Sequence, residues 1–220
     1  MERIIEQTAD GSATLFVPTL NEHYHSVKGA ETESQHIFIH MGLNASEAIP
    51  TRILEIGFGT GLNALLTLRA AKFDQRTVYY TGLELYPLAW ETVSELGYTS
   101  PDTSETELFK VIHNVPWGEE VNITPHFTLT KVQIDVNQWS SSEASVDLIY
   151  FDAFAPEKQS EMWTQELFNR LYVMLDKGGI LTTYCAKGIV RRMLQSAGFQ
   201  IERLPGPPGG KREILRGRKQ

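Results

Sequence analysis

Glu55-Ile56-Gly57-Phe58-Gly59-Thr60-Gly61 places three glycines at alternate positions, and this segment is the strongest indication of the fold. The apolar run 52–56 predicts a buried parallel strand, whereas 62–71 carries leucines and alanines on one helical face. Glycines at such a turn permit positive φ and let the backbone approach a ligand closely. The helix that follows points free N–H groups at that ligand. The segment therefore predicts a nucleotide-cofactor loop between a strand and a helix.

The spacing of the glycines separates two classes of cofactor loop. A dinucleotide fingerprint, G-x-G-x-x-G, would need its third glycine where Leu62 stands. The pattern E-x-G-x-G-x-G instead resembles the first motif of the S-adenosylmethionine-dependent methyltransferases. A glycine-rich turn alone also occurs in ordinary loops, so its context must decide. The resemblance implies cofactor binding by Glu55, Gly57, Phe58, Gly59, Gly61 and Asn63.

A carboxylate follows the second predicted strand. Residues 77–83 form a strand pattern that ends in Glu84, and Pro87 is placed to begin the next helix. A carboxylate at this point can accept hydrogen bonds from both ribose hydroxyls of a cofactor. The alternative is a solvated glutamate favoured by the dipole at a helix start. The register of Glu84 with the glycine loop favours cofactor binding.

Two further acids, Asp135 and Asp152, follow the predicted strands 127–134 and 146–151. Ligands of open parallel sheets bind outside the carboxyl ends of the strands. Asp135 is therefore placed to accept a hydrogen bond from the adenine amine, and Asp152 to face the reactive end of the cofactor. Each is also a candidate cap before a turn or helix, an alternative that weighs more for Asp135. Side chains able to wall a planar base beside Asp152 are Phe154, Pro156, Met162 and Trp163.

The predicted elements alternate between strands and helices, a pattern typical of an α/β fold. Helices are expected at 87–96 and 162–175 besides the one after the glycines, and Gly198 ends another. The last two strands are joined by a Pro/Gly-rich link, which predicts an antiparallel pair at the end of an otherwise parallel sheet. No regular pattern is assigned to 97–125. The remaining expected strands are 180–184, 199–204 and 212–215.

Composition limits the class of protein. A chain of 220 residues with 41% apolar residues suits one catalytic domain, expected at 49–220, with residues 1–48 as an N-terminal extension packed on it. The first ten residues lack an apolar leader and no run approaches a membrane span, so a soluble, cytoplasmic protein is expected. Cys185 is the only cysteine, which excludes an intrachain disulfide and argues against a cysteine-based zinc site. It is interpreted as a small buried thiol.

The net charge of −7 is distributed unevenly along the chain. Residues 187–220 carry a balance of +7, whereas residues 1–186 carry −14. The basic segment predicts a phosphate-contacting surface on one edge of the domain. The alternative is a solvated helix face with a charged edge strand. The cations concerned are Lys187, Arg191, Arg192, Arg203, Lys211, Arg212, Arg216, Arg218 and Lys219.

From about residue 50 to 217 the chain looks like the methyltransferase domain of the MnmC-type tRNA wobble-uridine modification enzymes. His23-Tyr24-His25-Ser26 and Glu33-Ser34 are similar to the N-terminal segment of stand-alone members, whereas residues 97–125 match weakly. The segments that carry the resemblance, besides residues 55–63, are Leu83-Glu84-Leu85-Tyr86-Pro87-Leu88, Asp135-Val136-Asn137, Asp152-Ala153-Phe154-Ala155-Pro156-Glu157-Lys158, Glu161-Met162-Trp163, Gly188-Ile189-Val190-Arg191-Arg192 and Lys211-Arg212-Glu213-Ile214-Leu215.

This resemblance implies a Rossmann-like, seven-stranded fold that uses S-adenosyl-L-methionine. The implied reaction is N-methylation of the primary amine of 5-aminomethyluridine, with or without a 2-thio group, at the tRNA wobble position, giving 5-methylaminomethyluridine. Bifunctional members continue into a flavin-dependent oxidase domain, for which this chain has no room, so only methylation is expected. Asp152 is the implied catalytic residue, and the tRNA anticodon stem-loop is the implied partner. The implied substrate contacts are Tyr24, Phe154, Pro156, Trp163, Lys211 and Arg212.

Three alternatives remain open. A metal site at His23, His25, His36 and His40 is not expected, because H-x-H on a strand points to opposite faces and no acidic third ligand is evident. A loop that closes over the substrate is the preferred interpretation of these residues. An aminopropyltransferase acting on a small amine shares the fold and the acidic strand ends, and turnover of decarboxylated cofactor would identify it. A non-catalytic module would bind cofactor and RNA without methyl transfer.

Overall fold

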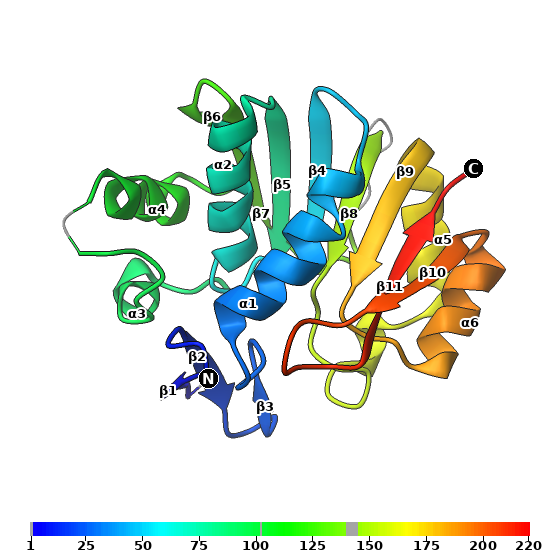
Figure 1. Ribbon diagram of the computed structural model, residues 1–220, viewed down its shortest axis with the longest axis horizontal. Coiled ribbons are helices and arrows are strands. Elements are labelled where there is room, and N and C mark those ends of the chain that lie inside the picture. The colour runs from blue at the N-terminus through cyan, green and yellow to red at the C-terminus, as the bar shows by residue number, and fades with distance from the viewer. Residues whose placement is uncertain (1, 102, 140–144) are drawn as a thin grey trace.

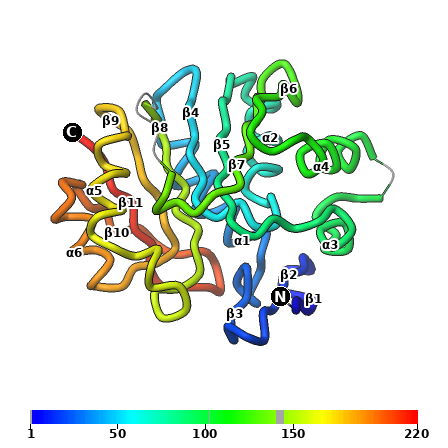
Figure 2. Tube along the Cα trace, turned by 180° about the vertical axis from the view of Figure 1, so that it is seen from behind, coloured from blue at the N-terminus to red at the C-terminus, as the bar shows by residue number. Residues whose placement is uncertain are grey.

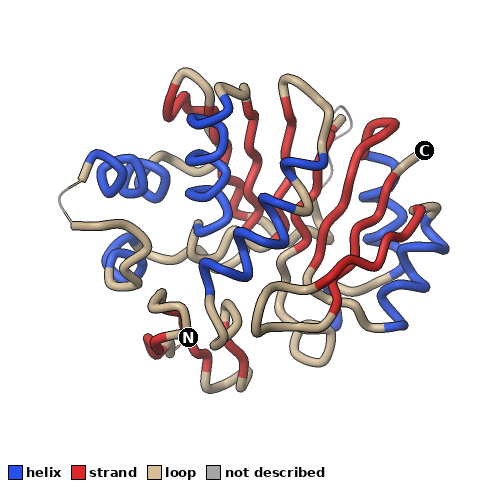
Figure 3. The backbone as a smooth tube through the Cα atoms, in the orientation of Figure 1, coloured by secondary structure: helices blue, strands red, loops and turns tan. Residues whose placement is uncertain are grey.

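The computed structural model describes residues 2–101, 103–139 and 145–220. Residues 1 and 102, which fall in the predicted extension and in the unassigned stretch 97–125, lie outside the described residues, as do 140–144. The described chain forms one large sheet covered by helices on both faces, with a small sheet at one end (Figures 1 and 3). No helix in these residues has the length and apolarity needed to cross a bilayer.

The large sheet has the strand order β10-β11-β9-β8-β4-β5-β7-β6. Its five central strands are parallel, and β11 pairs antiparallel with both β9 and β10, which confirms the predicted antiparallel pair at one edge. At the other edge β6 pairs antiparallel with β7, so the sheet has one strand more than the seven expected. The strands are β4 (Thr51–Ile56), β5 (Val78–Glu84), β6 (Glu120–Thr124), β7 (Phe127–Gln133), β8 (Val146–Phe151), β9 (Leu175–Thr183), β10 (Gln200–Pro205) and β11 (Glu213–Arg218).

Two hydrophobic cores lie on opposite faces of this sheet, because successive side chains of a strand point to opposite sides. In β8, Leu148 and Tyr150 pack on one face, and Ile149 and Phe151 pack on the other. The first face is covered by α1 (Ala30–Ser34), the π-helical turn Gln35–His40, α2 (Leu62–Asp74) and α4 (Ser104–Asn114). The second face is covered by α5 (Gln165–Met174) and α6 (Gly188–Ala197).

Capping residues decide where several helices begin and end. Thr164 accepts a hydrogen bond from the backbone N–H of Leu167 at 3.2 Å, so α5 begins at Gln165 rather than at 162. Gly198 adopts φ 112° and ends α6, as predicted. The helix expected at 87–96 is the shorter α3 (Trp90–Ser94). The stretch 97–125 contains α4 and β6, which had no assignment.

The N-terminal residues form a three-stranded antiparallel sheet of β1 (Ile4–Gln7), β2 (Ala13–Val17) and β3 (Glu22–His23). It lies beside the carboxyl ends of the parallel strands, as the views from both sides show (Figures 1 and 2). The Asp10 carboxylate joins it to α1 by accepting the backbone N–H of Thr32 at 2.9 Å. The Arg69 guanidinium of α2 binds Glu31 of α1 at 2.6 Å and Glu105 of α4 at 2.7 Å.

Candidate active site

A cavity of about 1020 Å³ opens at the carboxyl ends of β4, β5 and β8. Its walls come from the loop after β4, the segment 152–159 after β8, the N-terminal residues 22–27 and residues 211–213 at the start of β11. Pockets for one small ligand typically measure roughly 300–1,000 Å³. The cavity is therefore at the upper end of that range and has room for a cofactor beside a second ligand.

The glycine loop brings the ends of β4, β5 and β8 together. Gly57, Gly59 and Gly61 adopt φ values of 91°, 50° and 71°, a region that favours glycine. A Cβ on Gly57 would also lie 2.5 Å from the carbonyl oxygen of Asp152, so no side chain fits there. No side chain caps α2 at Gly61, which leaves its first backbone amides for a ligand. The loop thus has the shape and the donors that a cofactor requires.

Glu84 and Asp135 lie at the ends of neighbouring strands, and both line the cavity. The Glu84 carboxylate accepts the backbone N–H of Gly59 at 2.9 Å and that of Tyr86 at 2.8 Å. Asp135 Oδ1 accepts the N–H of Asn137 at 2.8 Å, so the turn-capping interpretation of Asp135 is present in the structure. Each carboxylate oxygen can accept more than one hydrogen bond, and these contacts therefore leave both acids able to accept from a ligand.

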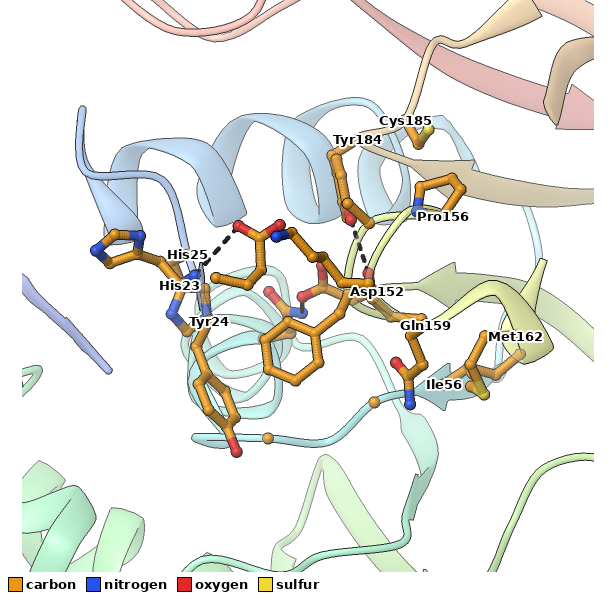
Figure 4. Close-up of a pocket in the computed structure, with 18 of the residues that line it drawn as sticks. His23, Tyr24, His25, Ile56, Asp152, Pro156, Gln159, Met162, Tyr184 and Cys185 are labelled. Atoms are coloured by element: carbon orange, nitrogen blue, oxygen red, sulfur yellow. Dashed lines mark hydrogen bonds between the residues drawn. The ribbon is translucent and has the colours of Figure 1, made fainter. Parts of the chain in front are cut away.

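Asp152 follows β8 and lies at the centre of the residues that line the cavity (Figure 4). Its backbone N–H donates to the carbonyl of Ile56 at 3.0 Å, and its Oδ2 accepts a hydrogen bond from Asn63 Nδ2 at 2.8 Å. Burial raises the pKa of the Asp152 carboxyl to about 7, and the Asn63 hydrogen bond opposes that rise. A carboxyl group of this kind can take up and release a proton near neutral pH.

Aromatic and charged side chains close the cavity around Asp152. The rings of Tyr24 and Phe154 meet edge to face with centroids 5.0 Å apart. The Lys211 ammonium lies 3.7 Å from the Tyr184 ring centroid and 3.3 Å from Glu33 Oε1. This cluster joins the N-terminal segment, the end of β9 and the start of β11 into one wall.

Twelve of the predicted site residues lie at this cavity. They come from the glycine loop, from the ends of three strands, and from the N-terminal and C-terminal segments of the chain. Where they lie is consistent with the predicted roles and does not test them. These residues are Tyr24, Gly57, Phe58, Gly59, Asn63, Glu84, Asp135, Asp152, Phe154, Pro156, Lys211 and Arg212.

Trp163 lies behind the cavity wall and is not among the residues that line the cavity, so its predicted substrate contact has no support from its position and stays a prediction. Its residue surface is 6% exposed, and its indole N–H donates to the Phe154 carbonyl at 2.7 Å. The indole packs on Phe151 with centroids 4.8 Å apart. A tryptophan needs a partner for its N–H when buried, and here the cavity wall supplies it. Trp163 therefore supports Phe154 from the second face of the sheet.

Glu55 and Gly61 also lie outside the cavity lining. Glu55 is fully buried because, alternating with Leu54 and Ile56, it points to the face covered by α2. Gly61 donates its N–H to the carbonyl of Phe58 at 2.8 Å and directly precedes α2. The structure shows that both residues shape the loop, and their predicted contact with the cofactor stays a prediction.

Most cations of the basic segment are paired within the chain. The Lys219 ammonium binds the carbonyls of Tyr172 at 2.9 Å and Leu175 at 2.7 Å, where α5 ends. The ion pairs join Lys187 to Glu157, Arg203 to Glu213, Arg216 and Arg218 to Glu202, and Lys211 to Glu33. Within the described residues, Arg191, Arg192 and Arg212 form no ion pair, so these three arginines could meet a phosphate without breaking an ion pair inside the chain.

The histidines of the metal alternative bind separate partners. His23 Nε2 lies 2.9 Å from a Glu6 carboxylate oxygen, and His36 Nε2 lies 2.9 Å from the Pro205 carbonyl. Burial lowers the pKa of His25 to about 4. No group of three or more His, Cys, Asp or Glu converges on a metal-sized site in the part of the chain that the structure describes. Cys185 is buried with a raised thiol pKa, as expected of a packed thiol.

Two residues of the site, Glu33 and Tyr184, were not assigned a role from the sequence. Tyr184 lies directly after β9, and the strand-end rule that found Asp152 would also have found it. Its hydroxyl donates to the Ala153 carbonyl at 2.8 Å. Glu33 belongs to a short helix of the N-terminal segment, and no local pattern connects it with the sheet.

Comparison with known proteins decides the family. Residues 103–220, more than half of the chain, match the sequence model of a family of S-adenosyl-L-methionine-dependent methyltransferases. The chain belongs to this methyltransferase family. Its cofactor is S-adenosyl-L-methionine, and the predicted methyltransferase fold is confirmed.

The methyltransferase is 30% identical over 237 residues to the "tRNA 5-methylaminomethyl-2-thiouridine biosynthesis bifunctional protein MnmC" of Pseudoalteromonas atlantica. The match covers 97% of this chain and 33% of that protein, so the chain spans about a third of the length of the curated relatives it matches. The crystal structure of MNMC2 from Aquifex aeolicus superposes with a TM-score of 0.81 and 25% identity, covering 99% of this chain and 70% of that one. The resemblance to the MnmC methyltransferase domain is confirmed.

A second solved structure shares the fold alone. Spermidine synthase from Thermotoga maritima superposes with a TM-score of 0.58 at 14% identity, covering 99% of this chain and 72% of that one. The methyltransferase therefore shares its fold with both MNMC2 and spermidine synthase, and the fold alone does not distinguish methyl transfer from aminopropyl transfer.

Proposed function

We propose that this methyltransferase methylates the primary amine of 5-aminomethyluridine, with or without a 2-thio group, at the wobble position of tRNA, giving 5-methylaminomethyluridine. The observation that supports the proposal most is the similarity along 97% of the chain to a protein named for 5-methylaminomethyl-2-thiouridine biosynthesis in tRNA. The base in that name carries one N-methyl group more than the proposed substrate. The Asp152 carboxyl in the cavity adds a group suited to an amine substrate.

The cofactor would lie against the glycine loop. In the proposed arrangement Gly57, Phe58 and Gly59 contact it through the backbone, Glu84 accepts from the ribose hydroxyls, and Asp135 accepts from the adenine amine. When bound, S-adenosyl-L-methionine supplies an electrophilic methyl group on a sulfonium centre. The free oxygen lone pairs of Glu84 and Asp135 and the uncapped start of α2 support this arrangement.

The chain must present the substrate amine as a neutral nucleophile, because an alkylammonium ion has no lone pair. The amine nitrogen would form the new C–N bond with its lone pair and lose one proton, and the electrons of the broken methyl–sulfur bond would stay on sulfur. Asp152 is the proposed acceptor of that proton. Its pKa of about 7 allows it to accept near neutral pH and later release the proton to water.

The uracil ring would be enclosed by aromatic and apolar side chains. Tyr24 and Phe154 present an edge-to-face pair to the cavity, and Pro156 follows them in the same wall. Stacking on such side chains is the usual way in which proteins hold an unpaired base. Trp163 would keep Phe154 in place.

The tRNA backbone would contact the cations at the rim of the cavity. Arg212 and Lys211 line it, and α6 begins directly after Lys187, another lining residue. Arg191 and Arg192 lie on that helix and, in the described residues, have no acidic partner. We propose that these arginines contact phosphates of the anticodon stem-loop.

Residues 1–48 are proposed to form an extension packed on the catalytic domain 49–220. Support comes from contacts that cross this boundary. Arg69 binds Glu31, and Arg216 donates to the carbonyl of Met41 at 2.9 Å. Tyr24 reaches from the extension to Phe154 in the cavity wall.

The proposal is tested by transfer of labelled methyl from S-adenosyl-L-methionine to tRNA carrying 5-aminomethyluridine. Matched tRNA lacking the aminomethyl group is the control. Transfer to the modified tRNA alone is the expected result. A parallel reaction with decarboxylated cofactor and a small diamine tests aminopropyl transfer. Turnover only there, or cofactor binding without transfer to either tRNA, would overturn the proposal.

A further inference from the structure

Asn63 connects two carboxyl groups at the base of the cavity. It is the second residue of α2, and its residue surface is 3% exposed. Its side-chain nitrogen donates to Glu55 Oε1 at 2.9 Å and to Asp152 Oδ2 at 2.8 Å. An amide nitrogen carries two hydrogens, so this bridge uses both. The side chain therefore ties α2 to the ends of β4 and β8.

The chemistry of the two neighbours decides the orientation of this amide. The reversed orientation would place Asn63 Oδ1 against two carboxyl groups, which repels unless both carry a proton. In the orientation with Asn63 Nδ2 toward the two carboxyl groups, an ionised Asp152 accepts a hydrogen bond from the amide. Asn63 Oδ1 and Glu55 Oε2 are then buried without a hydrogen-bond partner among the described residues. The bridge thus leaves two buried oxygens without a hydrogen-bond partner among the described residues.

Glu55 is the neutral end of the bridge. Its side chain is fully buried, and no cation forms an ion pair with it in the described residues. Burial raises the pKa of Glu55 well above its ordinary value, and the charge of Asp152 adds to the rise. A protonated Glu55 still offers its carbonyl oxygen to Asn63, and it places no second negative charge beside Asp152.

Several other groups face Asp152 from the surrounding elements. Glu33 of α1 raises the pKa of Asp152, whereas Lys211 before β11 lowers it. The Tyr184 hydroxyl after β9 is neutral, since burial raises its pKa, and it donates to the Ala153 carbonyl at 2.8 Å. Asn63 is the group that donates directly to the Asp152 carboxylate in the described structure.

We propose that Asn63 is a positioning residue for methyl transfer: one amide N–H fixes Asp152 Oδ2, buried Glu55 holds the other, and Asp152 Oδ1 is left for the substrate amine. This assignment replaces the expectation that Asn63 binds the cofactor. It rests on the proposed function only for the identity of the amine. The ionisation of Asp152 can be measured without any substrate, so the two proposals fail separately.

The first measurement is a ¹³C NMR titration of the protein labelled at its aspartate carboxyl carbons. One resonance should titrate near pH 7 and be missing in Asp152→Asn. Loss of a hydrogen bond to a charged group should raise this midpoint in Asn63→Ala by about one unit or more. Asn63→Ser keeps one donor and is expected to give an intermediate midpoint, which preserves the test if the alanine variant does not fold. An unchanged midpoint in the folded variants would overturn the assignment.

Glu55→Gln examines the other end of the bridge. Glutamine is neutral and still offers an oxygen to Asn63, so the Asp152 midpoint should stay within about half a unit of the wild-type value if Glu55 is protonated. A fall of a full unit or more would show that Glu55 carries a negative charge beside Asp152. The bridge as described would then be incorrect.

Kinetics separates positioning from cofactor binding. Asn63→Ala should lower kcat by about 10-fold or more at pH 7, consistent with a lost charged hydrogen bond, with less than about 3-fold change in cofactor Kd. The matched control is Asn169→Ala, which removes an exposed asparagine of α5. A large loss of cofactor affinity with kcat preserved would return Asn63 to the cofactor site.

Discussion

At the residue scale, Asp152 combines access to the cavity with a carboxyl group that burial keeps partly protonated near neutral pH. Replacing it with alanine should reduce kcat by about 10²–10⁴-fold, the usual contribution of a positioned proton acceptor. Cofactor affinity should stay nearly unchanged, because Glu84 and Asp135 are intact. Single-turnover rates and calorimetric cofactor titration measure the two quantities. Full activity of Asp152→Ala would remove Asp152 from the mechanism.

The same carboxyl group predicts a pH dependence. The pKa of Asp152 is raised, and only its ionised form accepts a proton, so activity should rise as pH increases through about 7. Single-turnover rates between pH 5.5 and 8.5 would show this limb. In Asp152→Asn the limb near pH 7 should disappear, whereas any limb from the substrate amine should remain. A wild-type rate that is flat through pH 7 contradicts this prediction.

The acids at strand ends could be found from the sequence because the apolar pattern shows where each strand ends. The carboxyl ends of parallel strands lie at the same edge of the sheet, where ligands bind. Glu84, Asp135 and Asp152 all reach the cavity for this reason. The burial of Trp163 was not foreseen, because its position in the sequence does not show that the Phe154 carbonyl accepts the indole N–H. Glu33 was missed because it is brought to Lys211 by tertiary packing across 178 positions of sequence.

At the scale of elements, the central strands were predictable because they are apolar on both faces. The helix α4 and the strand β6 were not assigned. Only Phe109 and Ile112 of α4 are buried, and β6 is a half-exposed edge strand, so neither element carries a long apolar pattern. The start of α5 differs from the expected residue 162 because the Thr164 side chain caps its first turn, so the helix begins at Gln165.

The contact between β5 and the glycine loop gives a prediction at this scale. A Cβ on Gly82 would lie 2.4 Å from the Phe58 ring, so Gly82→Ala should force this ring out of its packed position and disturb the glycine loop. Overpacking of this kind costs about 1–3 kcal/mol, and both the melting temperature and cofactor affinity should fall. The matched control is Gly188→Ala, whose Cβ would meet only the end of the Arg192 side chain at 3.3 Å. Equal behaviour of the two variants would contradict the packing argument.

At the scale of the whole molecule, the chain has a net charge of −7, and in the described residues of its basic segment 187–220 three arginines, Arg191, Arg192 and Arg212, form no ion pair. The sequence located the basic segment, but it could not show that most of its cations bind acids or helix carbonyls of the same chain. Pairing depends on the antiparallel register of β10 and β11, which places Arg203 within reach of Glu213 and Arg216 within reach of Glu202.

The arginines that form no ion pair are the cations that we expect to contact the tRNA phosphates. Arg191→Ala/Arg192→Ala should weaken tRNA binding and lower the slope of log affinity against log salt by about 1–2. The control is Lys72→Ala/Lys177→Ala, which removes two exposed lysines near the amino ends of the parallel strands. Fluorescence anisotropy at several salt concentrations measures both. An unchanged slope in the arginine variant would place the tRNA elsewhere.

The ion pair between Glu33 and Lys211 has a consequence for biosynthesis, because its partners are 178 positions apart in the chain. At roughly 5–20 residues per second on the ribosome, Glu33 is synthesised about 9–36 s before Lys211. The N-terminal side of the cavity is therefore synthesised well before the β11 segment that pairs with it. A nascent chain arrested before β11 would lack the cavity wall that residues 211–213 supply, so the glycine loop would be exposed to solvent on that side.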